Sequence, residues 1–328
     1  MKQFQYVRPT EASSAISALL KDPEAKFVAG GTNLLDLMKR GVEAPERLVD
    51  INRLPLRDIT KSSQGFSIGA LTLNSTLAEN KEIRKDLPLL SQALLAGASA
   101  QLRNMATVGG NLLQRTRCPY FYDTSMPCNK RMPGSGCGAL NGFNRMHAIF
   151  GASEHCIAVN PSDMNVALTA LDATIHLSGP RGKRNIPIQD FHRLPGDQPE
   201  RDTVIGKNEL ITGISVPTSA LKHVHYLKIR DRSSYAFALV SVAAALDIRG
   251  NTIRKASLAM GGVAHKPWRL AEVENFLAGK QISANVFQEA GTLAMRGARA
   301  YEHNEFKLKL GPLSIGHALS IASGLVKA

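Results

Sequence analysis

The chain has 328 residues, and 44% of them are hydrophobic, which is enough for two or three packed domains and excludes a disordered polymer. Forty Lys and Arg against 27 Asp and Glu give a formal net charge of +13, which would suit an anionic partner. The basic residues are scattered, however, and no zinc-finger, RRM or KH signature is present, so no nucleic-acid partner is expected. The longest apolar run, residues 235–246, is too short to span a bilayer, so no membrane insertion is expected either.

The first ten residues, MKQFQYVRPT, contain no apolar core of a signal peptide. We therefore expect a cytoplasmic location by default, or a periplasmic one if a signal-bearing partner exports the chain after folding. In a reducing compartment, cysteines are expected to be metal ligands or buried thiols rather than disulfides. The chain has four, which are Cys118, Cys128, Cys137 and Cys156.

The N-terminal part alternates helical and strand-like patterns, which predicts mixed α and β layers. The helices are predicted at residues 10–22, 33–41, 75–80 and 87–104, and the strands at 25–30, 47–51 and 66–72. From residue 114 to about 158 the periodicity gives way to a stretch rich in Pro, Gly, Asn and Cys. Such a stretch is long for a loop without structure of its own, so it needs some additional stabilisation.

Regular structure returns with a helix at 161–173, for which Ser162 is the predicted N-cap. Strands follow at 174–179, 183–188 and 209–217, and residues 218–223 read as a link to a second domain. That domain is predicted to contain strands at 224–231, 235–248 and 252–263, and then helices at about 270–278, 283–300 and 313–326.

Two glycine pairs fall at turns where a backbone could approach a phosphate group. Gly30 and Gly31 separate a predicted strand from a helix, and Gly109 and Gly110 lie in the strand-like or turn segment ATVGGNLLQ. Paired glycines allow backbone N–H groups close to an anion, although a tight turn without a ligand explains them equally well. The chain contains no P-loop motif, and GSGCGA at 134–139 follows no strand, so neither a P-loop nor a Rossmann site is predicted.

Five motifs occur in a familiar order: AGGTNLL, ATVGGNLLQ, PSDM, YLKIRDRSSYAFALVSVAAAL and MGGVAHKPWR. Over essentially its whole length, the chain resembles the FAD-binding (medium) subunit of the xanthine oxidase family of molybdenum hydroxylases. It is most like the flavoprotein subunit of bacterial three-subunit aldehyde oxidoreductases of the periplasmic type. The resemblance implies an α+β fold, with a two-part FAD-binding domain of the vanillyl-alcohol oxidase type at 1–217 (subdomains about 1–55 and 56–217) and a smaller α+β domain at 222–328.

The resemblance also implies cofactor-binding residues. The turn with Gly30 and Gly31 would wrap the FAD pyrophosphate, and the turn with Gly109 and Gly110 would bind it from the other side. Three further residues would contact or flank the flavin. These residues are Lys26, Val28, Ala29, Gly30, Gly31, Thr32, Asn33, Leu34 and Leu35; Thr107, Gly109, Gly110 and Asn111; and Asp163, Ile211 and Lys228. Many relatives have an acid in place of Asn33. Asp163 could instead be an acid favoured in a first helical turn, and Lys228 an exposed strand charge.

Most relatives lack the segment from about 115 to 157, which therefore reads as an insertion. The related 4-hydroxybenzoyl-CoA reductases carry a comparable insertion with a [4Fe–4S] cluster, which implies that Cys118, Cys128, Cys137 and Cys156 hold such a cluster here. The spacing C-x9-C-x8-C-x18-C matches neither ferredoxins nor structural zinc sites. A zinc site that includes His147 or His155, or four unligated thiols, remain alternatives.

In the function that the resemblance implies, the chain does not transform an organic substrate. A large partner subunit would carry the molybdenum cofactor, a small partner would carry two [2Fe–2S] clusters, and FAD on this chain would pass electrons to an external acceptor. One alternative is a 4-hydroxybenzoyl-CoA-reductase-like subunit, in which electrons run the other way. A remote alternative is a zinc-stabilised basic protein that binds nucleic acid.

Overall fold

The N-terminal region is a small parallel sheet packed beside a helix. The structure, a computed structural model, describes residues 1–327. In this region it contains β1 (Gln5–Val7), α1 (Ala12–Lys21), β2 (Ala25–Val28), α2 (Leu34–Lys39) and β3 (Arg47–Asp50). The strands are parallel in the order β1-β3-β2. Gly41 ends the α2 turn with a φ of +73°, in the left-handed region that glycine favours, as the sequence predicts.

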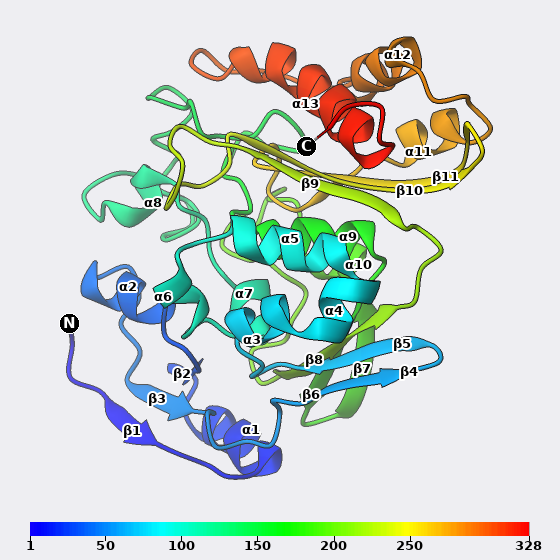
Figure 1. The fold of residues 1–328 in the computed structure, drawn as a ribbon. Coiled ribbons are helices and arrows are strands. Elements are labelled where there is room, and N and C mark those ends of the chain that lie inside the picture. The colour runs from blue at the N-terminus through cyan, green and yellow to red at the C-terminus, as the bar shows by residue number, and fades with distance from the viewer. Residues whose placement is uncertain (328) are drawn as a thin grey trace.

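The second region is an antiparallel sheet with a layer of short helices on it. Its strands are β4 (Ile59–Ser62), β5 (Gly65–Gly69), β6 (Thr174–Gly179), β7 (Gly182–Pro187) and β8 (Leu210–Pro217), in the order β4-β5-β8-β6-β7. Strand β8 joins two hairpins that lie about a hundred residues apart in sequence. The helices are α3 (Asn74–Glu79), α4 (Lys81–Asp86), α5 (Pro88–Ala96), α6 (Ala100–Arg103), α7 (Val108–Leu112), α9 (Asp163–Ala170) and α10 (Ile188–Phe191), while α8 (Pro119–Tyr122) lies away from this sheet, in the cysteine-containing segment (Figure 1).

The C-terminal region is a second antiparallel sheet, covered on both faces (Figure 1). Its elements are β9 (His223–Ile229), β10 (Val240–Arg249), β11 (Thr252–Gly261), β12 (Trp268–Arg269), α11 (Ala271–Leu277), α12 (Ala284–Ala294) and α13 (Phe306–Ala322). Helices α5 and α9 lie on one face and α11 and α13 on the other. Along β10, Ala243 and Ala245 join the first core, while Val242, Ala244 and Leu246 join the second. A strand buried on both faces explains the continuous apolar run.

The structure differs from the sequence predictions at several elements, and three of these differences concern the second glycine turn, the last helix and the long apolar strand. The segment ATVGGNLLQ contains the short helix α7, because Thr107 caps it. Helix α13 begins at Phe306 rather than at 313, although Pro312 lies inside it. Its first turn is held by the buried Lys307, whose ammonium donates to the carbonyls of His147 (2.8 Å) and Gly262 (2.7 Å). The third difference is strand β10, which begins at Val240, so residues 235–239 form a loop.

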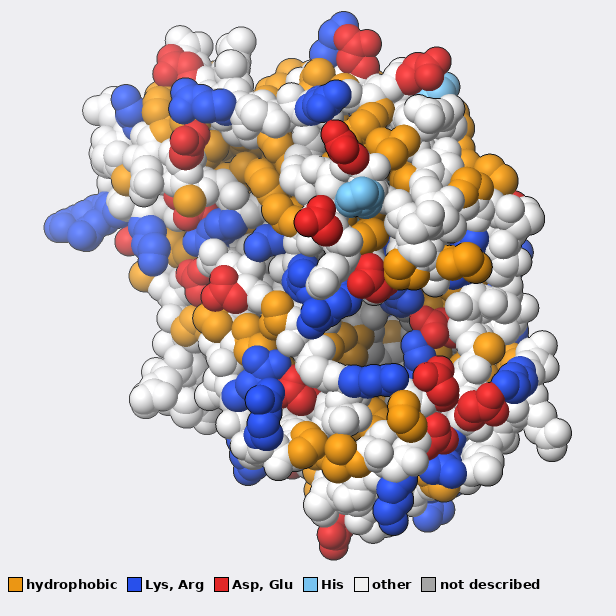
Figure 2. Space-filling model, turned by 180° about the vertical axis from the view of Figure 1, so that it is seen from behind, with side chains coloured by type: hydrophobic (Ala, Val, Ile, Leu, Met, Phe, Trp, Pro, Cys, Tyr) orange, Lys and Arg blue, Asp and Glu red, His pale blue; other side chains and the backbone are white. Residues whose placement is uncertain are grey.

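Residues 218–222 between β8 and β9 contain neither helix nor strand, and the domain boundary at 217–222 stays a prediction. Within the described residues, no helix combines the length and apolar character needed to cross a lipid bilayer. Seen from behind, the surface is hollowed near its centre, and Lys, Arg, Asp and Glu side chains are interspersed around the hollow (Figure 2).

Candidate functional site

A cavity of about 620 Å³ opens where the three regions meet, within the size range of small-molecule sites. Its wall comes from α2, the helices α5 to α7, the cysteine-containing segment, the start of α9, and the loop between β9 and β10. Residues that line it include Thr32, Asn33, Asn74, Gly97, Arg103, Gly110, Asn111, Arg117, Cys118, His147, Asn160, Ser162, Asp163, Arg232, Tyr235 and Phe237.

The first glycine turn meets the second turn directly. A Cβ on Gly30 would come within 1.8 Å of the Met105 carbonyl oxygen, so only glycine permits this approach. Gly31 has a φ of +71°, which also favours glycine. Thr32 and Asn33, which follow, line the cavity. The turn therefore brings the α2 segment against the loop before α7.

The other predicted residues near the first turn do not line the cavity. Val28 and Leu34 pack in one small apolar cluster, and the side chain of Leu35 lies against Gly31. Lys26 pairs with Glu43 at 2.5 Å. The Ala29 carbonyl accepts a hydrogen bond from the Asn52 side chain at 3.0 Å.

The second turn presents Gly110 and Asn111 to the cavity. The Gly110 N–H donates to Thr107 Oγ1 at 3.2 Å, which fixes the first turn of α7. Gly109 packs against Ala70, where a Cβ would come to 3.1 Å, whereas a Cβ on Gly110 would meet only the Thr107 hydroxyl. Asn111 Oδ1 accepts from Ser162 Oγ at 2.7 Å and so ties α7 to the start of α9.

Asp163 is the residue where the middle and C-terminal regions are joined at the cavity. Its Oδ2 pairs with the Lys228 ammonium at 2.7 Å, and its Oδ1 accepts from the Tyr226 hydroxyl at 2.8 Å. The Lys228 ammonium also donates to the Ala96 carbonyl at 3.1 Å. The side chains of Asp163 and Lys228 are 7% and 4% exposed. Lys228 is thus a buried partner of Asp163 rather than an exposed strand charge.

Ile211 lies apart from this arrangement. It is 4% exposed and packs in the core beneath the helices, and it does not line the cavity. Ser162 caps α9, as the sequence predicts, because its hydroxyl accepts from the Asn165 N–H at 3.0 Å.

Sequence reasoning missed the loop between β9 and β10, because the run from Tyr235 reads as a continuous strand. In the structure Tyr235 has a φ of +51° and is 61% exposed, and Phe237 is 40% exposed. Both line the cavity, as does Arg232. The preceding DRSS is turn-forming, and this signal could have moved the predicted strand start. Asn74, also missed, has a buried Oδ1 without a protein partner.

The cysteine segment folds over one side of the cavity. The backbones of Cys128 and Cys137 form an isolated antiparallel β-bridge. Cys118 lines the cavity, with its Sγ 3.2 Å from His147 Nε2. Burial raises the pKa of the Cys118 thiol to about 12 and that of Cys156 to about 11, and charge interactions with neighbouring cysteines add to both shifts. None of the four cysteines forms a disulfide.

The two implied cofactors fit these residues differently. Asn33 Nδ2 and Asn74 Oδ1 are buried polar atoms without protein partners, as expected where a polar cofactor completes the hydrogen bonding. For the cysteines, the donor type and number suit a cluster, but the side-chain spacing does not. Within residues 1–327, no three His, Cys, Asp or Glu side chains are grouped closely enough to hold a metal ion.

The fold and this cavity define a class, an α+β protein with a cavity of small-molecule size and a C-terminal sheet domain. Residues 2–219 match the family model described as the FAD binding domain in molybdopterin dehydrogenase. Residues 225–309 match the CO dehydrogenase flavoprotein C-terminal domain. The chain belongs to the FAD-binding medium subunits of the xanthine oxidase family, and it is an oxidoreductase subunit.

Individual relatives agree with this assignment. The chain is 49% identical to the aldehyde oxidoreductase FAD-binding subunit PaoB of Escherichia coli, over 98% of this chain and 99% of that protein. It is 32% identical to the glyceraldehyde dehydrogenase medium chain of Sulfolobus acidocaldarius, over 88% and 85%. The structure of carbon monoxide dehydrogenase from Hydrogenophaga pseudoflava superposes with a TM-score of 0.77 at 26% identity, over 98% of each chain. The predicted family and fold class are confirmed, while the cofactor contacts stay predictions.

Gly110→Val tests the second turn. We expect the variant to retain about a tenth or less of the FAD of the unmodified chain, because the new side chain projects toward the cavity. The fold should persist, since a Cβ there meets only the Thr107 hydroxyl. The flavin-to-protein absorbance ratio and a thermal melt measure both effects. Normal FAD content would contradict the role of this turn.

Proposed function

We propose that this chain is the FAD-binding electron-transfer subunit of a molybdenum-containing aldehyde oxidoreductase. The observation that carries the proposal is the 49% identity, over almost the full length of both chains, to a protein named as an aldehyde oxidoreductase FAD-binding subunit. In this proposal a large partner holds the molybdenum cofactor and a small partner holds two [2Fe–2S] clusters. Electrons reach this chain from the small partner and leave to an external acceptor.

The residues of this chain would bind and orient the cofactor. Bound FAD supplies the redox chemistry. Thr32, Asn33, Gly110 and Asn111 would border its dinucleotide portion, and the Asp163 carboxylate, fixed by two donors, would accept a further hydrogen bond from it. Tyr235 and Phe237 would cover the cavity from the loop between β9 and β10.

The direction of electron flow is tested with the assembled complex. Aldehyde added anaerobically should bleach the flavin absorbance of this subunit, and an external acceptor should restore it. Bleaching by reduced ferredoxin but not by aldehyde would support a 4-hydroxybenzoyl-CoA-reductase-like function instead. Failure of both reductants to bleach bound flavin would contradict an electron-transfer role.

We also propose that Cys118, Cys128, Cys137 and Cys156 hold a [4Fe–4S] cluster, which would require the segment to bring their sulfur atoms closer together than they lie in the structure. Four thiolates are the usual ligand set, and here they come from one segment whose Cys118 reaches the cavity wall. The close contact between Cys118 Sγ and His147 Nε2 favours the second candidate, a mixed cysteine and histidine zinc site.

Cys137→Ser is expected to lose most of the iron and to destabilise residues 115–157, because metal binding is coupled to local folding. Metal analysis of anaerobically purified chain gives the content, and limited proteolysis reports the segment. Full iron content in the variant would remove Cys137 from the ligand set. Zinc without iron in the unmodified chain would favour the second candidate.

A further inference from the structure

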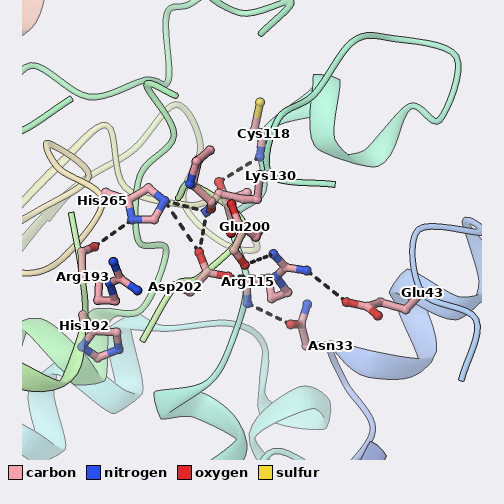
Figure 3. Close-up of polar contacts among 12 residues, drawn as sticks. Asn33, Glu43, Arg115, Cys118, Lys130, His192, Arg193, Glu200, Asp202 and His265 are labelled. Carbon is pink, nitrogen blue, oxygen red and sulfur yellow. Dashed lines mark hydrogen bonds and ion pairs between the residues drawn. The ribbon is translucent and has the colours of Figure 1, made fainter. Parts of the chain in front are cut away.

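We propose that Arg115 and Asp202 are positioning residues for the flavin dinucleotide, and that through Asn33 they couple FAD binding to the order of the cysteine segment. The inference rests on the proposed FAD site. It concerns a cluster of Asp202, Arg115, Lys130 and His265, which we term the Asp202 network (Figure 3); Lys130 and His265 are buried, and Asp202 and Arg115 are half-buried. Neither glycine turn contains any of these four residues.

The first step is the orientation of Asn33. Its Oδ1 accepts the backbone N–H of Arg115 at 2.9 Å, although the two residues are 82 positions apart. An amide oxygen must face this donor, so Nδ2 faces the other way. Nδ2 is buried without a protein partner, and Asn33 lines the cavity. A buried N–H group of this kind requires an acceptor, and a phosphate or carbonyl oxygen of a bound dinucleotide supplies one.

The second step is what holds Arg115. Its guanidinium donates to Asp202 Oδ2 at 2.8 Å, to Glu43 Oε1 at 3.0 Å and to the Glu200 carbonyl at 3.2 Å. The same group lies over the ring of Phe121, 4.8 Å from its centroid. Because these contacts fix the Arg115 side chain on several sides, they also fix the direction of the Arg115 backbone N–H. Arg115 precedes Cys118 by three residues, so the cysteine segment begins at this anchor.

The third step is the carboxylate that joins the network. Besides Arg115, Asp202 binds the Lys130 ammonium at 2.5 Å. Burial alone would raise the pKa of Asp202, but Lys130 and Arg115 together hold it below its usual range, so the carboxylate stays charged. Lys130 is 2% exposed and also contacts His265 Nε2 at 2.6 Å.

His265 connects the network to the C-terminal region. Its Nδ1 lies 2.9 Å from the Arg193 carbonyl, which makes Nδ1–H the donor and leaves Nε2 to accept from Lys130. Lys130 lies two residues after Cys128. Asp202 thus links the segment at two points, Arg115 and Lys130, and one of them contacts the cavity residue Asn33. FAD binding that fixes the orientation of Asn33 therefore also orders the cysteine segment, and order in the cysteine segment strengthens FAD binding by the same factor.

The test is a double-variant cycle on the full chain with FAD as the probe. Asn33→Asp keeps an acceptor for Arg115 but replaces the free donor with a carboxylate oxygen. We expect it to raise the Kd for FAD about tenfold or more. Arg115→Ala should have a similar effect, and the double variant should lose little beyond either single change. If Arg115→Ala does not fold, Asp202→Asn replaces it in the cycle.

Hydrogen exchange supplies a readout that a purely structural role would not give. Added FAD should slow exchange in residues 115–137 of the unmodified chain but not of Asn33→Asp. The matched controls are Asn285→Asp on an exposed helical turn and Arg184→Ala, whose Arg184–Glu209 pair lies apart from the cavity; both should bind FAD normally.

Normal FAD affinity in Asn33→Asp or Arg115→Ala would overturn the inference, as would effects that multiply in the double variant. Unchanged exchange in residues 115–137 would also overturn it. Each of these results leaves the proposed function intact, because the unmodified chain still binds FAD. If the unmodified chain binds no FAD, both proposals fail.

Discussion

Gly30→Ala is expected to abolish FAD binding and to destabilise the chain by about 3 kcal/mol or more, at the upper end of overpacking effects. The added methyl would stand 1.8 Å from the Met105 carbonyl oxygen and 2.6 Å from its carbon. Both are backbone atoms, so no side-chain rotation relieves the contact. The two turns must separate, and Thr32 and Asn33 leave the cavity wall with the first turn.

Urea unfolding and titration with FAD measure the two effects of Gly30→Ala. Gly316→Ala is the matched control, because the nearest atom to its added methyl, the Phe287 carbonyl oxygen, is 3.5 Å away. Gly316 lies in the interior of helix α13, where alanine is more favourable than glycine. This control should therefore gain up to about 1 kcal/mol of unfolding free energy and bind FAD normally. Near-normal stability and FAD affinity in Gly30→Ala would show that the two turns do not depend on this close approach.

Lys228→Met is expected to cost about 3–5 kcal/mol of unfolding free energy, because it leaves the Asp163 carboxylate buried without its cation. The Tyr226 hydroxyl still donates to Asp163, but a neutral donor replaces only part of the lost stabilisation. We also expect weaker FAD binding, since Asp163 lines the cavity and loses the partner that orients it.

Arg296→Met provides the comparison for Lys228→Met. Arg296 pairs with Glu272 at 3.4 Å, but the two side chains are 71% and 66% exposed, so loss of this pair should cost at most about 1 kcal/mol. Urea unfolding curves at one pH compare the two variants. Equal, small losses in both would mean that the Asp163–Lys228 pair contributes no more than a surface pair.

Much of the fold could be predicted from local patterns. The Ala25–Val28 strand, the Gly41 stop and the Ser162 cap depend on neighbouring residues, so sequence reasoning finds them. Strand β10 was predictable because burial on both faces produces a continuous apolar run. The same run concealed the start of the strand, because Tyr235 and Phe237 are apolar residues that face the cavity rather than a core.

The candidate site was predictable only in part. The glycine turns and Asp163 stand in recognisable motifs, and both turn motifs contribute residues to one cavity that Asp163 also lines: Thr32, Asn33, Gly110 and Asn111. The orientation of Asn33 depends on Arg115, 82 residues away, and that of Arg115 depends on Asp202, another 87 residues on. No local pattern encodes such contacts. Gly30 was predicted for its approach to phosphate, whereas the structure shows its approach to the Met105 backbone.

The most direct test of the central claim is flavin analysis of the purified full chain, with absorbance spectra before and after addition of dithionite. The account predicts about one FAD per chain, released on denaturation, with a flavin band that bleaches on reduction. A folded chain that stays colourless and takes up no FAD, even when FAD is added in excess, would contradict it.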